Sequence, residues 1–562
     1  MNTGDNNHRS AAGRHGVTRR DLLKMAALSG AGLVSLFSLA NCSPAAPAPA
    51  TQAPAAPKAT EAPKPAATTA PAPAASAAPA PAATQAAASG GTVTVIVPQS
   101  PPSLDMQTSS AKASYWPTMC MHEFLCRYDA SGKAVPSLAK KWDYIDPKTI
   151  SFDLPEGVKF HNGRELVADD IKKNVERILD PKVGATLRTQ MAPVDGVEAK
   201  GKYTAIFHLK NPWVFLFDKL VYLPIYPVEE IAAGKDPKTN PIGAGPFMFK
   251  EWRTDQYIDV VRFPDYYRKG YPKVDRIRFM PLSDAGAQRS TFLAKSADVL
   301  QQIRNADYDG YKAQADIYLK ETPLSQFFMF AFNTKKAPWD NVKVRQAVKY
   351  AVDRKAIVDA ALMGKGLPAF APVLPDSPYY TKEIEYQRDL PKAKQLLAEA
   401  GFPNGLEDTT LVINTPNDIL IAQVFQSQMK EAGINLKFET MEGPTLVDRV
   451  FNKKDQAVSE MGHTGPDMQR VLDLWLLPDG TQNMANYSNP KMTQLLTSAA
   501  AEPDDAKRAK IYQDALKLLV EDVPEIYLVT PTLITAAYKS VEGFTTVLDN
   551  TIDWSGVTTT KK

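Results

Sequence analysis

The sequence predicts an α/β fold spread over two or more domains. The chain has 562 residues, 44% of them hydrophobic, which is enough for more than one large core. A short apolar run at Phe327–Phe332 is followed by a loop and then by a pattern typical of an amphipathic helix. A second helical pattern stops at Gly433 and is followed directly by an alternating strand. Helices that alternate with strands in this way are typical of a sheet with helices on its faces.

The first 41 residues have the pattern of an export leader. Arg19 and Arg20 precede a moderately apolar run, Met25–Ala40, and the pair favours the twin-arginine route. That run has about 16 residues, fewer than the ~20 needed to span a bilayer. The segment Leu39–Cys42 resembles a bacterial lipobox. We therefore expect Cys42 to become the lipid-modified first residue of the mature protein.

Residues 42–90 are predicted to form a disordered tether. The segment is dominated by alanine and proline, so it cannot bury a core. At ~3.1 Å per residue it could extend on the order of 150 Å. A tether behind a lipid anchor indicates a protein held at the outer face of the cytoplasmic membrane. The leader carries a net charge of +3 and the tether +1, which leaves −1 for the body of this +3 chain, so nothing in the body indicates a nucleic-acid partner.

The first part of the body is predicted to contain both strands and helices. Thr92–Val97 alternates and is rich in β-branched residues, which indicates a strand. We expect a helix over 115–128, two strands within 150–161 around a turn at 155–157, and an amphipathic helix through Ile171 and Val175.

Two cysteines lie in the predicted helix 115–128. Six residues on a helix correspond to about 240° of rotation, so Cys120 and Cys126 would point in different directions. We favour two buried thiols, and a disulfide between them is the alternative. The spacing of the two cysteines is not a usual zinc pattern.

The second part of the body follows the same α/β alternation. Asp340 or Asn341 can cap the helix whose apolar stripe contains Val344 and Val348. Further strands are expected at 257–263, 327–332 and 434–440, and an apolar run lies at 527–534. Further helices are expected at 392–400, 423–433 and 468–476.

The sequence contains no common catalytic motif. There are six histidines, and neither H-E-x-x-H, G-x-S-x-G nor a phosphate-binding G-x-x-x-x-G-K-[ST] occurs. His161 is better explained as a histidine that hydrogen-bonds the backbone of a turn. We expect a protein that is not an enzyme, with an extracytoplasmic hydrolase as the alternative.

Several segments resemble family 5 solute-binding proteins, the peptide/nickel/opine-type binding components of ABC importers. The resemblance covers nearly all of residues 92–545, and the motifs occur in the family's order. Its main segments are Val158–Gly163, Pro241–Phe247, Asn333–Arg354 and Ala393–Phe402. One departure is Val167, which stands where the family has a threonine N-cap. Asp169 and Asp170 in the first turn partly compensate through the helix dipole.

The resemblance implies a two-lobed, periplasmic-binding-protein-like clamp of mixed sheets with flanking helices. Two crossing strands near 326–333 and 527–534 would join the lobes. Lobe one would then be 92–325 plus 535–562, and lobe two 326–534. It implies a monomer that needs no cofactor, captures a small solute outside the cytoplasm, and delivers it to an ABC permease.

The ligand site implied by the resemblance lies in 461–468. Peptide-binding members carry a Gly-Trp…Asp-Tyr-x-Asp-Pro segment there, whose first aspartate captures the ammonium group of a peptide. Asp467 matches that aspartate, whereas the tryptophan and the Asp-Pro pair are missing. Peptide, sugar, opine and nickel-chelate ligands therefore stay open, and no metal site is assigned. The predicted ligand-binding residues are Asp467, His463, Gly465, Trp116 and Trp475.

Overall fold

The computed structural model describes residues 90–109, 111–129, 132–413, 416–464, 468–546 and 550–561. These residues fall in one compact unit, 83–562. Cys42, Gly465 and Asp467 lie outside the described residues, as do the predicted leader and nearly all of the tether.

Twelve strands form one mixed sheet, in the order β16-β15-β17-β13-β18-β11-β1-β10-β9-β8, with β12 and β14 also paired to β18. Their bounds are β1 (Thr92–Val97), β8 (Phe247–Arg253), β9 (Tyr257–Arg262), β10 (Arg276–Pro281), β11 (Val299–Leu300), β12 (Ile317–Pro323), β13 (Gln326–Phe332), β14 (Gly366–Pro368), β15 (Leu406–Ile413), β16 (Ile434–Met441), β17 (Val458–Thr464) and β18 (Glu525–Tyr538).

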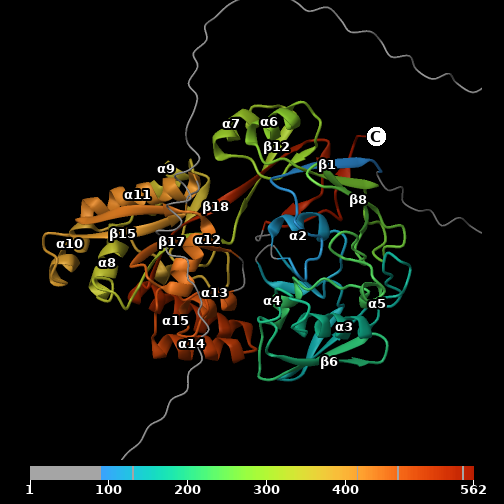
Figure 1. Ribbon diagram of the computed structural model, residues 1–562, viewed down its shortest axis with the longest axis horizontal. Helices are drawn as coiled ribbons and strands as arrows, with labels where there is room; N and C mark the ends of the chain where they lie inside the picture. The colour runs from blue at the N-terminus through green and yellow to red at the C-terminus, as the bar shows by residue number, and fades with distance from the viewer. Residues whose placement is uncertain are drawn as a thin grey trace, which may run out of the picture. The chain divides into compact units, whose positions relative to one another are not determined.

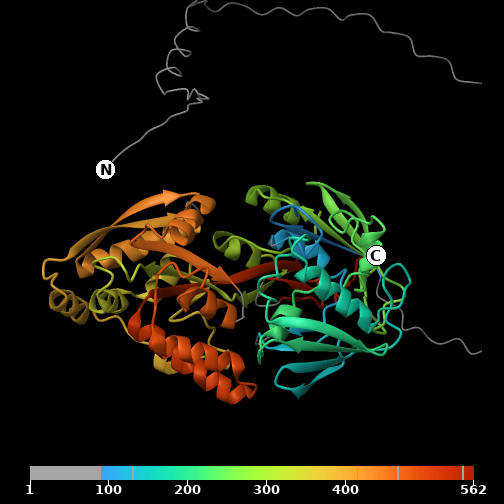
Figure 2. The same cartoon turned by 60° about the horizontal axis from the view of Figure 1, so that its bottom comes forward.

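The long strand β18 links the two halves of this sheet. Its first half pairs antiparallel with β13, and its second half pairs antiparallel with β12. The connection between β12 and β13 stays beside it, because the N–H of Leu324 donates to the carbonyl oxygen of Pro531 at 3.0 Å. In both views β18 passes from the orange elements to the blue and green ones (Figure 1 and Figure 2). The strands expected at 327–332 and 527–534 are therefore neighbours.

Helices pack against the β15–β16 half of the sheet. The connection from β15 to the parallel strand β16 is α11, which confirms the α/β unit predicted at Gly433. The ring of Phe330 stacks on that of Phe425 with centroids 4.2 Å apart. The N-cap of α8 is Asn341, whose side chain accepts from the N–H of Lys343. These helices are α8 (Val342–Ala351), α9 (Arg354–Ala361), α10 (Leu390–Glu399) and α11 (Pro416–Ala432).

A separate four-stranded sheet has the order β4-β5-β7-β6, and α3 packs on β6. Val167 begins α3 without a side-chain cap, and the Asp170 carboxylate instead accepts from the Val167 N–H at 2.9 Å. Asp170 in the first turn of α3 thus compensates for the missing N-cap side chain by a direct hydrogen bond as well as by its charge. The elements are β4 (Lys141–Asp146), β5 (Thr149–Asp153), β6 (Val194–Lys200), β7 (Thr204–Leu209) and α3 (Ala168–Leu179).

The helix predicted over 115–128 is wrong beyond residue 118. Helix α2 covers Lys112–Thr118 and contains Pro117, which removes a backbone donor and hinders continuation. Residues 126–128 instead form β2, which pairs with β3 (Ala134–Pro136). Cys120 and Cys126 therefore share no helix, and both are buried free thiols, as favoured. The second strand expected within 150–161 is only a bridge between Lys159 and Glu165.

The remaining elements complete the described residues. They are the helices α4 (Leu216–Leu220), α5 (Val228–Ala232), α6 (Ala285–Leu293), α7 (Tyr308–Lys312), α12 (Gly443–Val447), α13 (Met468–Leu476), α14 (Pro490–Ala501) and α15 (Asp505–Asp522), and the short strands β19 (Val541–Glu542), β20 (Thr545–Thr546), β21 (Ile552–Asp553) and β22 (Thr558–Thr559).

Candidate functional site

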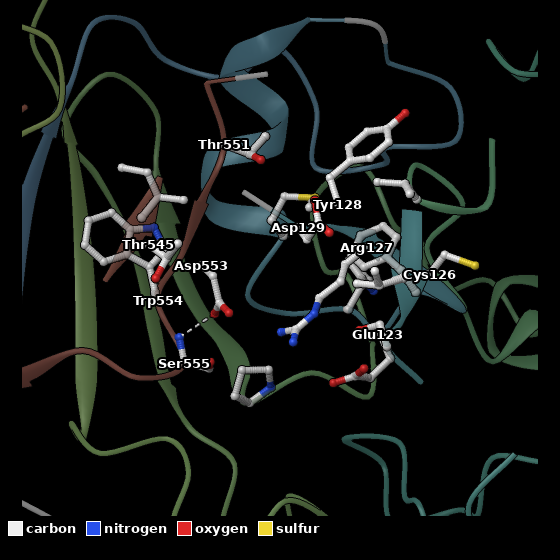
Figure 3. Close-up of a pocket in the computed structure, with 18 of the residues that line it drawn as sticks. Glu123, Cys126, Arg127, Tyr128, Asp129, Thr545, Thr551, Asp553, Trp554 and Ser555 are labelled. Atoms are coloured by element: carbon white, nitrogen blue, oxygen red, sulfur yellow. Dashed lines mark hydrogen bonds between the residues drawn. The ribbon is translucent and has the colours of Figure 1, made fainter. Parts of the chain in front are cut away.

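One candidate site is a cavity of about 340 Å³ beside β2 (Figure 3). We call it the β2 cavity. Residues from 119–137, 266–268 and 545–555 line it, together with Val221 and Pro246. Its volume is near the lower end of the ~300–1,000 Å³ typical of small-molecule sites. The cavity therefore suits a compact solute.

Glu123 forms the buried acidic wall of the β2 cavity. Its side chain accepts from the hydroxyl of Tyr266 at 2.7 Å and from that of Tyr267 at 3.4 Å. Arg268 lies 3.7 Å from the same carboxylate. Burial raises the pKa of Glu123, and Arg268 acts in the opposite direction. The hydrogen-bonding capacity and the charge of the Glu123 carboxylate are thus largely matched by groups of the protein itself.

Arg127 and Asp553 bring opposite charges to the same cavity. Arg127 is an exposed residue of β2, and its side chain has no ion pair or hydrogen bond with a described residue. In Figure 3 its guanidinium points into the space between the carboxylates of Asp553 and Glu123. Asp553 accepts from the N–H of Ser555 at 2.9 Å. Both groups keep hydrogen-bonding capacity for a further partner.

His122 adds a buried neutral ring to the lining. It is 2% exposed, and within the described part of the chain neither ring nitrogen has a hydrogen-bond partner. Burial, and to a smaller extent His161, lowers its pKa to about 3. A neutral imidazole offers one donor and one acceptor, and both are unused here. Thr546 likewise has a buried hydroxyl without a partner among the described residues.

A glycine-containing loop fixes the backbone beneath His122. The Gly243 N–H donates to Nδ1 of His161 at 3.2 Å, and Nε2 of His161 bonds the Gly245 carbonyl at 3.0 Å. This confirms that His161 structures a turn, and burial lowers its pKa to about 4. A Cβ on Gly243 would lie 2.0 Å from the carbonyl oxygen of Met121, so only glycine fits there.

A second, larger cavity of about 670 Å³ is lined by segments that precede β13 in the sequence and by segments that follow it. We call it the α15 cavity. Residues of 132–144 and 214–218 line one side, and residues of 372–379 and 503–509 line the other. The walls are aromatic, with the rings of Trp142 and Phe217 stacked at 4.5 Å.

The two sides of the α15 cavity touch at its edge. The Val214 N–H donates to the Ala500 carbonyl at 3.3 Å, and the Lys133 ammonium lies 2.6 Å from the Asp505 carboxylate. Both charged side chains are 59% exposed, so this ion pair contributes little stability.

The predicted ligand-binding residues are only partly described. Trp116 is 5% exposed within an apolar cluster, and Trp475 is 3% exposed with Phe451 at 5.8 Å. Neither lines the β2 or the α15 cavity, so their placement indicates packing, and ligand contact stays a prediction. His463 lies on β17 opposite Phe327 in the strand register.

The structure adds residues that sequence reasoning missed. Arg127 and Asp553 carry no local motif, and only the fold brings β2 beside the C-terminal segment. Within the described residues, no helix has the length and apolar character needed to cross a membrane, and no group of three or more His, Cys, Asp or Glu side chains could hold a metal ion.

Comparisons with known proteins identify the family. The model of bacterial extracellular solute-binding proteins, family 5, matches residues 133–483. Glutathione-binding protein GsiB from Pectobacterium atrosepticum is 28% identical over 462 residues, covering 79% of this chain and 89% of the relative. Heme-binding protein A from Haemophilus influenzae is 31% identical over 438 residues, which covers 70% of this chain and 78% of that relative.

A solved structure extends the similarity to the whole fold. The ABC transporter substrate-binding protein CtaP from Listeria monocytogenes has a TM-score of 0.77 and 26% identity, and the match covers 84% of this chain and 100% of that one. The two-lobed binding-protein fold expected from the sequence is thereby confirmed. The chain belongs to the family 5 extracellular solute-binding proteins, and it is a solute-binding component of an ABC importer.

Proposed function

We propose that this protein is a lipid-anchored, monomeric receptor that captures a small, peptide-like organic solute outside the cytoplasm and presents it to an ABC permease. The observation that carries the proposal is a cavity lined from both sides of β13, next to strands that connect the two halves of the sheet. One similar protein is named for binding glutathione and another for binding heme, so an organic solute fits the family better than a bare metal ion. Sugar, opine and nickel-chelate ligands are the alternatives.

Capture would work by closure of lobe 92–325 plus 535–562 against lobe 326–534. Only the closed state touches the solute from both sides, so binding shifts the population toward it. Small-angle scattering of the purified protein with and without its co-purifying solute, identified by mass spectrometry, tests this. A smaller radius of gyration is expected when the solute is bound, and an unchanged profile despite measured binding would refute closure.

Asp467 is the proposed specificity residue of lobe two, with His463, Gly465, Trp116 and Trp475 as further candidates. The alternative is that Asp467 caps α13, which begins at Met468. Asp467→Asn keeps most capping ability, so stability should change little in either case. If Asp467 pairs with an ammonium group, affinity should fall by roughly 2–5 kcal/mol. Unaltered affinity by calorimetry would leave only the capping role.

The anchor is proposed at Cys42, after twin-arginine export. Cys42→Ala should release the protein from the membrane fraction of a native-like host. Retention of the variant in that fraction would argue against lipidation. No catalysis is proposed, and hydrolysis of a peptide or ester by the purified protein would instead support the enzyme alternative.

A further inference from the structure

A loop of one proposed lobe contacts the other lobe beside β18. Residues 362–365 follow α9 and lead into β14, and both elements belong to the proposed lobe 326–534. The side-chain nitrogen of Asn305 donates to the carbonyl oxygen of Leu362 at 2.9 Å. Because Asn305 belongs to the proposed lobe 92–325, this hydrogen bond joins the two lobes directly.

Lys365, from the same loop, adds two charged contacts between the lobes. Its ammonium nitrogen lies 3.3 Å from the centroid of the Tyr308 ring and 3.4 Å from a carboxylate oxygen of Glu321. The hydroxyl of Tyr308 donates to the same carboxylate oxygen at 2.5 Å. The side chains of Lys365 and Glu321 are 21% and 40% exposed, so water screens the pair only in part. We call Asn305, Tyr308, Glu321 and Lys365 the hinge cluster.

The backbone ties the loop that carries Lys365 to β18. The N–H of Thr532 donates to the carbonyl oxygen of Lys365 at 3.2 Å, and β14 pairs with β18 from Gly366 onward. A Cβ on Gly366 would lie 2.7 Å from the carbonyl oxygen of Thr530, so this close approach requires glycine. Lys365 is therefore held on the strand that links the two halves of the sheet.

The hinge cluster and the contact at the edge of the α15 cavity lie on opposite sides of β18. In Figure 1, α7 and α9 lie above β18, whereas α14, α15 and β6 lie below it. Below β18 the N–H of Val214 bonds the carbonyl oxygen of Ala500, so the proposed lobes touch on both sides of the strand. A rotation about β18 that separated Val214 from Ala500 would press the loop at 362–365 against α7.

We infer that the hinge cluster holds the two lobes in their closed arrangement and so slows the release of a solute that it does not touch. Opening requires Lys365 to leave the Tyr308 ring and the Glu321 carboxylate, because these groups are already in contact and cannot approach further. Loss of the cluster shifts the population toward the open state and weakens solute binding by the same factor. The inference rests on the proposed closure of the lobes, and it adds positioning residues that line neither cavity.

The test measures the distance between the lobes in solute-free protein. Spin labels are attached at Lys200→Cys on β6 and Thr497→Cys on α14, two exposed positions on elements drawn below β18 in Figure 1. The full chain carries Cys42→Ala, whereas Cys120 and Cys126 are buried and stay unlabelled. Pulsed double electron–electron resonance then gives the populations at short and at long distance.

Lys365→Ala should raise the ratio of the long-distance to the short-distance population about 3- to 10-fold, as expected for the loss of one partly exposed ion pair and one cation–π contact. Tyr308→Leu should shift the ratio in the same direction. Combining it with Lys365→Ala should add little, because both substitutions remove the same contact. Lys365→Arg should stay near the wild-type ratio, since a guanidinium group can make both contacts.

Lys355→Ala is the matched control, because the ion pair of Lys355 with Asp359 lies within α9 and does not join the lobes. Its distance distribution should equal that of the wild type, and an equal shift in this control would overturn the inference. An unchanged ratio in Lys365→Ala, a shift of that variant toward the short distance, or a wild type that is already fully open would also overturn it. The scattering experiment with the co-purifying solute tests closure itself. Closure of the wild type and of Lys365→Ala in that experiment would leave the proposed function standing even if the hinge cluster proved to have no effect.

Discussion

Replacing Glu525 with glutamine should make the protein more stable and remove part of its pH dependence. Glu525 begins β18 and is 3% exposed. The hydroxyl of Tyr527 donates to one carboxylate oxygen at 2.7 Å, and the other oxygen has no partner among the described residues. Burial disfavours the charged form and raises the pKa of Glu525 to about 8, from a usual value of 4.5.

The magnitude follows from proton linkage. Between pH 4.5 and about 8 the native state keeps a proton on Glu525 that the unfolded chain releases. Ionisation of Glu525 therefore costs the protein nothing below pH 4.5. Above that pH the free energy of unfolding falls by about 1.4 kcal/mol per pH unit until the native group also ionises. Between about pH 5 and pH 7 the wild type should lose roughly 3 kcal/mol from this residue. Glutamine does not titrate and can still accept the tyrosine hydrogen bond.

Urea unfolding of wild type and Glu525→Gln at a series of pH values between 5 and 8 measures the difference. The free energy of unfolding of the variant should exceed that of the wild type by an amount that grows by roughly 3 kcal/mol between about pH 5 and pH 7. Glu521→Gln, at an exposed position of α15, is the control and should run parallel to the wild type. Parallel curves for Glu525→Gln would refute a protonated native Glu525.

Three further substitutions test local features of the fold. Gly243→Ala should lower the unfolding free energy by at least about 1–3 kcal/mol, since its Cβ would meet a backbone oxygen at 2.0 Å, whereas Gly196→Ala has open space and serves as its control in thermal melts. Asn341→Ala should cost about 1 kcal/mol in urea unfolding by removing the cap of α8, and Asn341→Asp should restore it. Lys133→Ala should cost less than about 1 kcal/mol and lose any effect at high salt, because its pair with Asp505 is exposed; a larger loss would mean that this contact holds the segments together.

Local patterns were sufficient where the elements depend on their own residues. The strand at Thr92–Val97 and the helix at Met468–Leu476 have the predicted bounds, because alternation and a helical apolar stripe decide both. The helix at 115–128 failed for the opposite reason. Pro117 weakens the helix from within, and β2 is extended because it pairs with β3, a contact that no window of the sequence contains.

By itself the sequence determined the α/β class, several of the helices and strands, and, through ordered motifs, the family. These depend on periodicity, caps and glycine stops, which are local properties of the chain. Only the tertiary structure decided where polar groups meet. Arg127 and Asp553 are far apart along the chain, and they face one cavity because β2 and the C-terminal segment fold beside each other. The free thiols and the raised pKa of Glu525 likewise depend on burial, which is set by all the elements packed around a side chain.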